Sequence, residues 1–217
     1  MALYKLLNNI QLIGISGHAG AGKDELAKML YSTYVDTYSE AFAGPLKLAC
    51  AHAFGMCERD FHDSAVKETN NSYWGVSPRM MAQFVGTELF RDHVWKLLRA
   101  DYSDFWVKRM YGKLSGMQRH PEDGDYVEGD TVVIPDVRFT EEVEFIQVNK
   151  GVHLHITRAS ATGEVGIIGH ASEAFNFPLT GEYTHILSNE GTLEDLYDRA
   201  KAIVTAHLNL TPYDIEI

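Results

Sequence analysis

A glycine-rich string at residues 17–24 constrains this chain more than any other feature. The string reads Gly-His-Ala-Gly-Ala-Gly-Lys-Asp, and it lies between the apolar run Ile10–Ser16 and the helix-like stretch Glu25–Tyr34. A strand, a glycine-rich turn and a helix in this order form a Walker A loop, which binds the phosphates of a nucleotide. The sequence therefore predicts an α/β fold and a nucleoside triphosphate as ligand.

The composition of the loop suits phosphate binding, with one departure. Glycines let the backbone turn its N–H groups inward around phosphate oxygens, and Lys23 can reach the β- and γ-phosphates. Asp24 stands where most such loops have a Ser or Thr that binds Mg²⁺. A glycine-rich turn with a chance lysine is the alternative. The predicted donor-binding residues are Gly17, His18, Ala19, Gly20, Ala21, Gly22, Lys23 and Asp24.

Length and charge narrow the class of protein. The chain has 217 residues, 45% of them hydrophobic and 23% charged, which is ordinary for one globular domain with an insertion. Its formal net charge of −11 gives no positive field for polymeric nucleic acid or for a membrane surface. No signal segment or long apolar run is present, so we expect a cytosolic protein, with Cys50 and Cys57 as core or near-core thiols.

Short apolar runs alternate with amphipathic stretches, a pattern typical of βαβ units and a parallel sheet. An irregular polar excursion is expected from Cys57 to about Gly75. Ser77, Ser103, Thr140 and Thr192 are expected to cap helices. Strands are predicted at Ile10–Ser16, Ser39–Ala43, Thr131–Ile134, Val152–Thr157 and Thr184–Ser188. Helices are predicted at Lys23–Val35, Leu46–Phe54, from Pro78 past Leu89, Ser103–Leu114, Glu141–Val148 and from Thr192 to about Leu208.

Three further parts of the sequence contain candidate catalytic or binding residues. Asp136 ends an apolar strand, where it could hold Mg²⁺ through water or merely cap a helix, and Arg138 follows at the same edge. Arg158 precedes the stretch 159–169, which is either a closing lid or a disordered segment. The helix after Ser77 carries Arg79, Gln83, Gly86 and Thr87 on one face or its shoulder, although a solvated helix is the simpler explanation of that periodicity alone.

Several separated strings together resemble the bacteriophage-type deoxynucleoside monophosphate kinases, which share the P-loop NMP-kinase fold. The resemblance runs from about Ile10 to Leu208, and the Lys-Asp ending of the loop is among its most specific elements. The matching strings are the loop 17–24, Phe-Ala-Gly-Pro-Leu-Lys at 42–47, Ser-Pro-Arg at 77–79, Gln-Phe-Val-Gly-Thr-Glu at 83–88 with Arg91, Asp-Val-Arg-Phe at 136–139 with Glu142, and His-Ala-Ser-Glu at 170–173.

The resemblance implies a transfer of the γ-phosphoryl group from ATP, with Mg²⁺, to a deoxynucleoside monophosphate. It implies a five-stranded parallel sheet, with core residues at about 10–50 and 130–210, a helical acceptor-binding insertion at about 51–128 and a short lid at about 158–173. A homodimer is also expected. If the chain is encoded by a phage, its compartment would be the host cytoplasm.

The resemblance also implies roles for single residues. Lys23 would hold the donor phosphates, and Asp24 and Asp136 would take part at the metal. Arg79 would bind the acceptor phosphate. Arg138 and Arg158 would neutralise charge on the transferring group. Asn189 and Gly191 would lie near the donor adenine. The other acceptor-side residues are Lys47, Gln83, Gly86, Thr87, Arg91, Trp106, Glu142 and Glu173.

This chain departs from the family pattern at two places, and two other functions stay open. Gly44 stands where the family often has an acidic residue, and 159–169 contains no arginine that a lid could contribute. A related kinase could act on dephospho-coenzyme A, a nucleoside or another small acceptor. A nucleotide-binding regulatory module is the third reading, although the string Asn149-Lys150-Gly151-Val152 lacks the aspartate of a GTPase base-reading motif.

Overall fold

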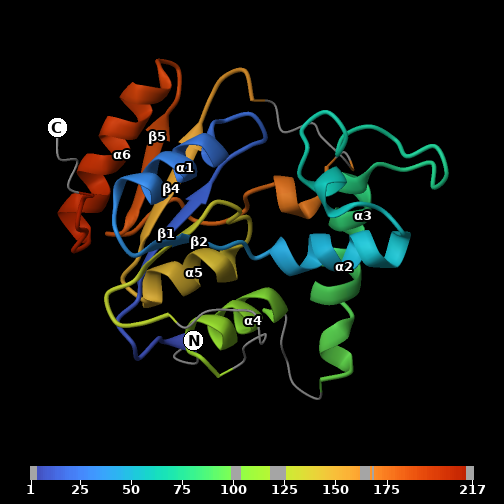
Figure 1. Cartoon of the computed structure of the whole chain (residues 1–217), viewed down its shortest axis with the longest axis horizontal. Coiled ribbons are helices and arrows are strands. Elements are labelled where there is room, and N and C mark those ends of the chain that lie inside the picture. The colour runs from blue at the N-terminus through green and yellow to red at the C-terminus, as the bar shows by residue number, and fades with distance from the viewer. Residues whose placement is uncertain (1–3, 99–103, 118–125, 162–166, 168, 214–217) are drawn as a thin grey trace. The chain divides into compact units, whose positions relative to one another are not determined.

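The computed structural model describes residues 4–98, 104–117, 126–161, 167 and 169–213. The chain forms two compact units (Figure 1). The sheet unit comprises Met1–Ala41, Val107–Thr162 and Phe175–Ile217, and the helical unit comprises Phe42–Trp106 and Gly163–Ala174. The predicted boundaries of core, insertion and lid stay a prediction.

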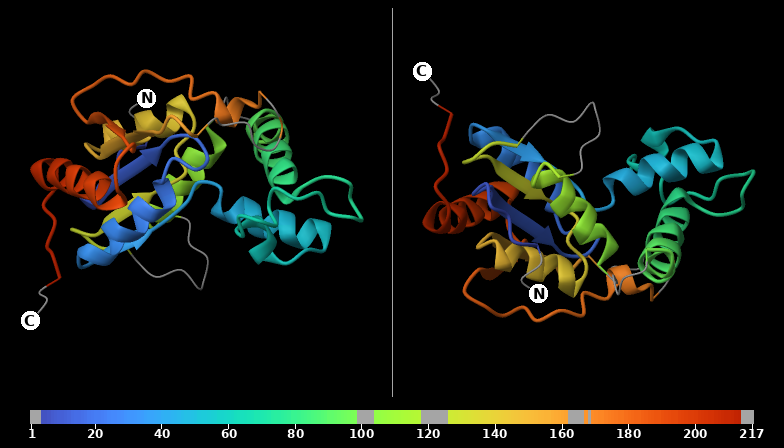
Figure 2. Two further views of the ribbon diagram at one scale, coloured as in Figure 1. Left: turned by 90° about the horizontal axis from the view of Figure 1, so that it is seen from above. Right: turned by 90° about the horizontal axis from the view of Figure 1, so that it is seen from below.

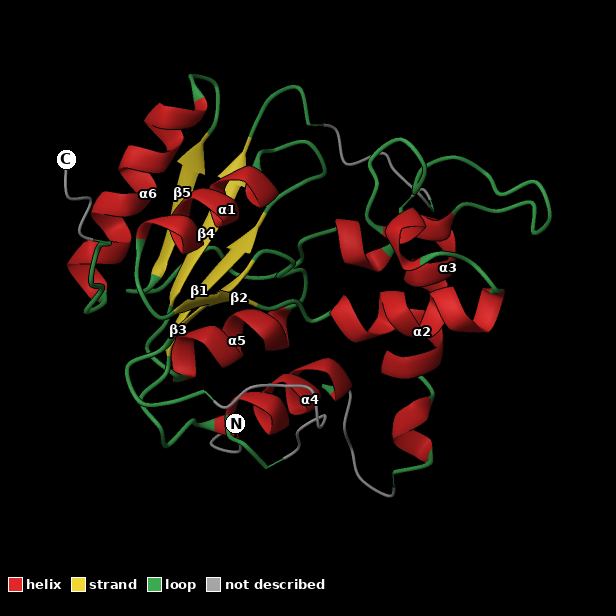
Figure 3. Ribbon diagram, in the orientation of Figure 1, coloured by secondary structure: helices red, strands yellow, loops and turns green. Residues whose placement is uncertain are grey.

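A five-stranded parallel sheet forms the centre of the sheet unit (Figure 3). Its strand order is β2-β3-β1-β4-β5, so β1 lies in the middle. The connections from β1 to β2 and from β3 to β4 are helical. The inner strands β1, β3 and β4 are buried, as expected where helices cover both faces, and β4 alternates apolar residues with His153 and His155. The α/β prediction is therefore confirmed. The strands are β1 (Gln11–Ser16), β2 (Thr37–Ser39), β3 (Thr131–Ile134), β4 (Val152–Thr157) and β5 (Thr184–Ser188).

The two faces of the sheet have different neighbours. Helices α1 (Lys23–Thr33) and α6 (Leu193–His207) cover one face, where Leu26, Leu30 and Leu196 join the main hydrophobic core. Helix α5 (Thr140–Val148) covers the other face, and Figure 2 shows α1 and α5 on opposite sides of β1. Gly14 lies under α5, because a Cβ there would come within 2.9 Å of Ile146.

The helical unit contains α2 (Gly44–Phe54) and α3 (Pro78–Phe84), followed by a π-helical segment, Val85–Arg91. Its described residues also form three short 3-10 helices, Glu58–Phe61, Val94–Lys96 and Ala171–Glu173. Helix α4 (Phe105–Leu114) begins in the helical unit and belongs to the sheet unit from Val107 onward. The excursion from Cys57 to Gly75 consists of the first 3-10 helix and turns, as its irregular pattern predicted.

The predicted strand Ser39–Ala43 is wrong, because β2 lies two residues earlier and ends at Ser39. Its position is set by pairing with β3, where Thr37 is opposite Thr131 and Ser39 is opposite Val133. An edge strand that is half-buried or exposed carries no apolar run, so its hydrophobicity gave no signal for its ends.

The predicted long helix after Ser77 is only partly right. Ser77 caps α3, since its hydroxyl accepts a hydrogen bond from the N–H of Met80 at 3.3 Å. After Phe84 the helix widens to a π-helix, in which the N–H of Asp92 bonds the carbonyl of Thr87 at 2.9 Å. This change of period turns the side chains that follow away from the apolar stripe, and Leu89 is exposed instead of buried. Phe84, the last residue of α3, is exposed as well.

Two smaller expectations are also corrected, and one lies outside the described residues. Thr140 is the first residue of α5 and not its cap; its hydroxyl donates to the carbonyl of Asn176 at 3.2 Å. Cys57 is exposed, whereas Cys50 is buried and its burial raises the pKa of its thiol to about 11. Ser103 lies outside the described residues. The cap at Thr192 is confirmed, because its hydroxyl accepts from the N–H of Asp195.

Candidate active site

The phosphate loop between β1 and α1 has the backbone that its sequence predicts. Gly17, Gly20 and Gly22 all have positive φ, at 137°, 80° and 100°. Other residues rarely adopt these conformations, so the three glycines permit the sharp turns of the loop. The ammonium group of Lys23 donates to the carbonyl of His18 at 2.8 Å, so the lysine lies along its own loop.

Side chains of the residues that directly follow β4 and β5 contact the phosphate loop. The buried side-chain amide of Asn189 donates to the carbonyl of Ala21 at 2.8 Å, and a Cβ on Gly22 would come within 2.6 Å of that amide. Arg158, an exposed residue directly after β4, reaches the carbonyl of Gly20 at 3.5 Å. Asn189 and Arg158 thus meet the loop although about 140 to 170 residues separate them from it in sequence.

The end of β3 lies beside the end of β1. The N–H of Val137 donates to the carbonyl of Ile15 at 3.1 Å, so Asp136 follows β3 at the edge where the phosphate loop begins. The buried carboxylate of Glu142 accepts from the N–H of Arg138 at 2.7 Å and from that of Phe139 at 3.1 Å. Glu142 therefore fixes the turn that carries Arg138, and it caps α5 from within.

A buried polar chain, missed in the sequence, lies on the α5 face of the sheet. The hydroxyl of Ser16 is 2.8 Å from Nε2 of His153 and 2.8 Å from Nδ1 of His155. Burial lowers the pKa of His153 to about 4, with His155 and His185 adding to the effect. Burial also lowers the pKa of His155, and the neighbouring His18 and Lys23 act in the same direction. Both rings are therefore neutral at pH 7.

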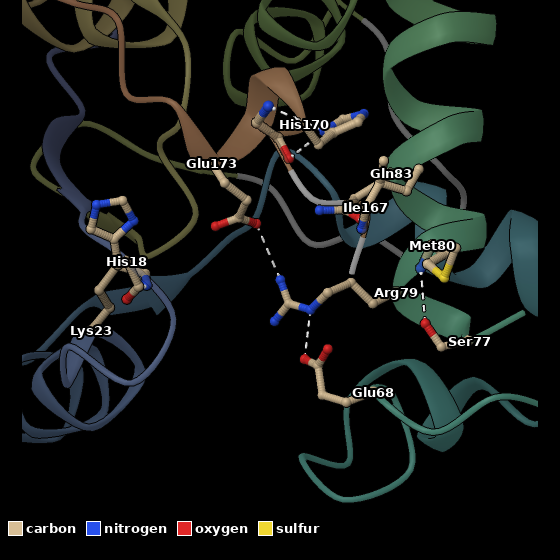
Figure 4. Close-up of polar contacts among 11 residues, drawn as sticks. His18, Lys23, Glu68, Ser77, Arg79, Met80, Gln83, Ile167, His170 and Glu173 are labelled. Atoms are coloured by element: carbon tan, nitrogen blue, oxygen red, sulfur yellow. Dashed lines mark hydrogen bonds and ion pairs between the residues drawn. The ribbon is translucent and has the colours of Figure 1, made fainter. Parts of the chain in front are cut away.

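In the helical unit, Arg79 lies between two carboxylates (Figure 4). Its Nε donates to Glu68 at 2.6 Å, and one Nη1 hydrogen points to Glu173 at 3.2 Å. The side chains of Arg79 and Glu173 are 12% and 7% exposed, so this is a largely buried charge cluster. A planar guanidinium has five N–H donors, so these two bonds orient Arg79 without using all of its donors. The role of Glu68 had no sequence signal.

Helix α3 and the π-helical segment that follows it contact Ile167 and His170 at two further points. The side-chain oxygen of Gln83 accepts from the N–H of Ile167 at 2.8 Å. Nε2 of His170 is 3.3 Å from the carboxylate of Glu88. In the π-helical segment, the carbonyl of Gly86 accepts from the indole N–H of Trp106 at 2.9 Å. A Cβ on Gly86 would come within 2.5 Å of Leu46. Gln83, Gly86 and Trp106 are thus held within the helical unit.

The remaining predicted site residues vary in exposure. Asp24 and Gly191 are exposed, Lys47, Thr87 and Asp136 are half-buried, and Arg91 is buried. Within the described ranges, no group of three or more His, Cys, Asp or Glu side chains is arranged to hold a metal ion. The glycine conformations and Lys23 fit a polyphosphate, whereas the metal roles of Asp24 and Asp136 stay predictions.

Each helix in the described part of the chain is too short or too polar to cross a bilayer.

Comparison with known proteins identifies the family. No family model matches the chain. A protein of Acanthamoeba polyphaga mimivirus, which carries the provisional name deoxynucleotide monophosphate kinase, is 30% identical over 193 residues. The alignment covers 87% of this chain and 93% of the mimivirus protein. The chain therefore belongs to the deoxynucleotide monophosphate kinase family.

Proposed function

We propose that this chain transfers the γ-phosphoryl group of ATP to the 5′-phosphate of a deoxynucleoside monophosphate. The phosphate loop supports the donor half of this proposal more than any other observation, because three positive-φ glycines and Lys23 make a cradle for a polyphosphate. The family relationship supports a nucleotide as the acceptor. The products would be a deoxynucleoside diphosphate and ADP.

The proposed reaction needs positioning and charge neutralisation and no covalent intermediate. An oxygen of the acceptor phosphate forms a bond to the γ-phosphorus while the bond from that phosphorus to the bridging oxygen of ADP breaks. Lys23, Arg138 and Arg158 would spread the negative charge that develops on the transferring group. Bound Mg²⁺ would neutralise charge on the donor phosphates, with Asp24 and Asp136 as its proposed protein partners.

On the acceptor side, Arg79 is the proposed ligand of the nucleotide phosphate. Glu68 and Glu173 hold its guanidinium in one orientation, which limits the rotamer freedom lost when a phosphate binds. Lys47, Arg91, Gln83, Gly86, Thr87, Trp106, Glu142 and Glu173 are the other proposed acceptor-side residues. Asn189 and Gly191 are proposed to border the donor adenine. A cytosolic homodimer is part of the proposal.

A panel of acceptors tests this function. ADP formation is measured with ATP and Mg²⁺ against the four deoxynucleoside monophosphates, the matching ribonucleotides, deoxynucleosides and dephospho-coenzyme A. We expect turnover with at least one deoxynucleoside monophosphate and none with deoxynucleosides. Turnover with dephospho-coenzyme A alone would assign a different acceptor, and ATP binding without turnover would favour a regulatory module.

A further inference from the structure

The buried chain formed by Ser16, His153 and His155 lies directly under the phosphate loop. Ser16 and His153 are completely buried and His155 is 7% exposed, so their polar groups must be satisfied within the protein. A serine hydroxyl has one hydrogen to donate. One imidazole can therefore accept from Ser16 while the other donates to it, which requires the accepting ring to be neutral.

Contacts from β4 reach the start of the loop from two sides. His155 holds the side chain of Ser16, its register partner across β1 and β4. The next residue of β4, Ile156, contacts the backbone of Gly17 so closely that a Cβ on Gly17 would lie 2.3 Å from the Ile156 carbonyl oxygen. The exit of β1 is thus fixed by a side-chain contact at Ser16 and a backbone contact at Gly17.

Phe175 adds a third contact to the same place. Its ring lies edge-on to the ring of His18 at 4.9 Å between centroids and to that of His155 at 5.8 Å. Phe175 has a φ of 45°, which is uncommon for a bulky residue and persists only where surrounding contacts favour it. His155 therefore contacts Ser16 before the loop directly and is linked to His18 inside the loop through Phe175.

We infer that His155 is a positioning residue for the phosphate loop, which acts through the hydroxyl of Ser16 to hold the loop in the geometry that binds the donor polyphosphate. This inference rests on the proposed donor half of the function but not on the identity of the acceptor. His155 itself need not touch the nucleotide.

Equilibrium binding of ATP to the full-length protein, without acceptor, tests the inference. His155→Leu and Ser16→Ala each leave a buried polar partner unsatisfied, and we expect each to weaken ATP binding by about tenfold. His155→Asn keeps an amide that can donate or accept at the position of Nδ1, and it should stay within about threefold of the unsubstituted protein. The double variant Ser16→Ala/His155→Leu should lose no more than the weaker-binding single variant, because both break one chain.

His185→Leu is the matched control. His185 is a half-buried histidine on β5 of the same sheet, and it is not part of the hydrogen-bonded chain formed by Ser16, His153 and His155. Its ATP affinity should not change. The inference is overturned if His155→Asn or His185→Leu binds ATP as weakly as His155→Leu does. It is also overturned if Ser16→Ala and His155→Leu both bind ATP normally. Thermal unfolding shows whether each variant is folded. If His155→Leu does not fold, the ATP affinity of Ser16→Ala, which removes only one oxygen, tests the inference.

The experiments distinguish a failure of the proposed kinase function from a failure of the inference about His155. If ATP binds and Lys23→Ala abolishes binding, but no acceptor is phosphorylated, the kinase assignment fails while the role of His155 still stands. If the unsubstituted protein does not bind ATP, the donor half is wrong and the inference falls with it. In an active enzyme, His155→Leu should raise the KM for ATP and leave the KM for the acceptor unchanged.

Discussion

The phosphate loop and the Arg79 helix, α3, are held in place by different kinds of contact. The loop depends on backbone conformation at Gly17, Gly20 and Gly22 and on the carbonyl groups that Lys23 and Asn189 bond. Arg79 instead depends on two carboxylates, from Glu68 and Glu173. A backbone cradle is specified locally, whereas a charge cluster needs side chains from three separate parts of the chain. The cluster around Arg79 should therefore be sensitive to each of its members, whereas the loop should be most sensitive to changes in its own glycines and in Lys23.

The largest expected effect is at Lys23. Replacing it by alanine removes the cation that we propose binds the donor phosphates, and we expect kcat/KM to fall by about a thousandfold, or about 4 kcal/mol. Steady-state kinetics with ATP and the best acceptor measure this loss. Lys28→Ala is the control in the same helix, because Lys28 is exposed and pairs only with Glu25 among the described residues. An equal loss in both variants would contradict a specific role for Lys23.

A smaller loss is expected at Arg79. Arg79→Ala removes the proposed phosphate ligand and leaves the buried carboxylate of Glu173 beside Glu68 without their shared cation. We expect kcat/KM for the acceptor to fall by about a hundredfold, close to 3 kcal/mol, while ATP binding is kept.

Arg59→Ala is the control for Arg79, since the Arg59 side chain is 86% exposed and lies 3.9 Å from Asp60. Its kinetics should match those of the unsubstituted enzyme. If Arg79→Ala weakens ATP binding as much as acceptor use, the division of the two substrates between the loop and the Arg79 helix is wrong.

The buried histidines make the stability of the sheet unit depend on pH. The pKa of His153 is about 4 in the folded protein and near 6.5 when unfolded, so the unfolded chain binds more protons between these values. The free energy of unfolding should therefore be greatest above pH 6.5 and fall as the pH drops toward 4, by at most about 3 kcal/mol. Urea unfolding at several pH values measures this. His153→Gln should flatten most of the slope, and an unchanged slope would contradict the assignment.

The smallest effect concerns the helical unit. Trp106→Phe keeps a buried ring but removes the hydrogen bond to the carbonyl of Gly86, and we expect it to lower the free energy of unfolding by about 1 kcal/mol. Trp74→Phe removes a bond of the same 2.9 Å length, to the carbonyl of Phe54, at a more exposed site. Its cost should be smaller, because water can replace the lost donor. Equal costs would show that burial of the Gly86 carbonyl has no effect.

Sequence patterns were sufficient where hydrophobic periodicity and local turn chemistry agree. The ends of β3, β4 and β5 and the cap at Thr192 were predicted correctly because buried apolar runs and cap residues are local signals. Edge strand β2 and the π-helix after Phe84 were not, since pairing with β3 sets the first and the second changes the helical period without a sequence signal.

The sequence by itself determined the phosphate loop, because its glycines and lysine lie within one short stretch, Gly17–Lys23, and the required backbone conformations are intrinsic to glycine. It also determined the parallel α/β class, through the alternation of apolar runs and helices. Only the tertiary structure decided how Arg79 meets Glu68 and Glu173, and how Ser16 joins His153 to His155. These contacts join residues up to 139 positions apart. Their partners are selected by strand register and packing, which no local pattern encodes.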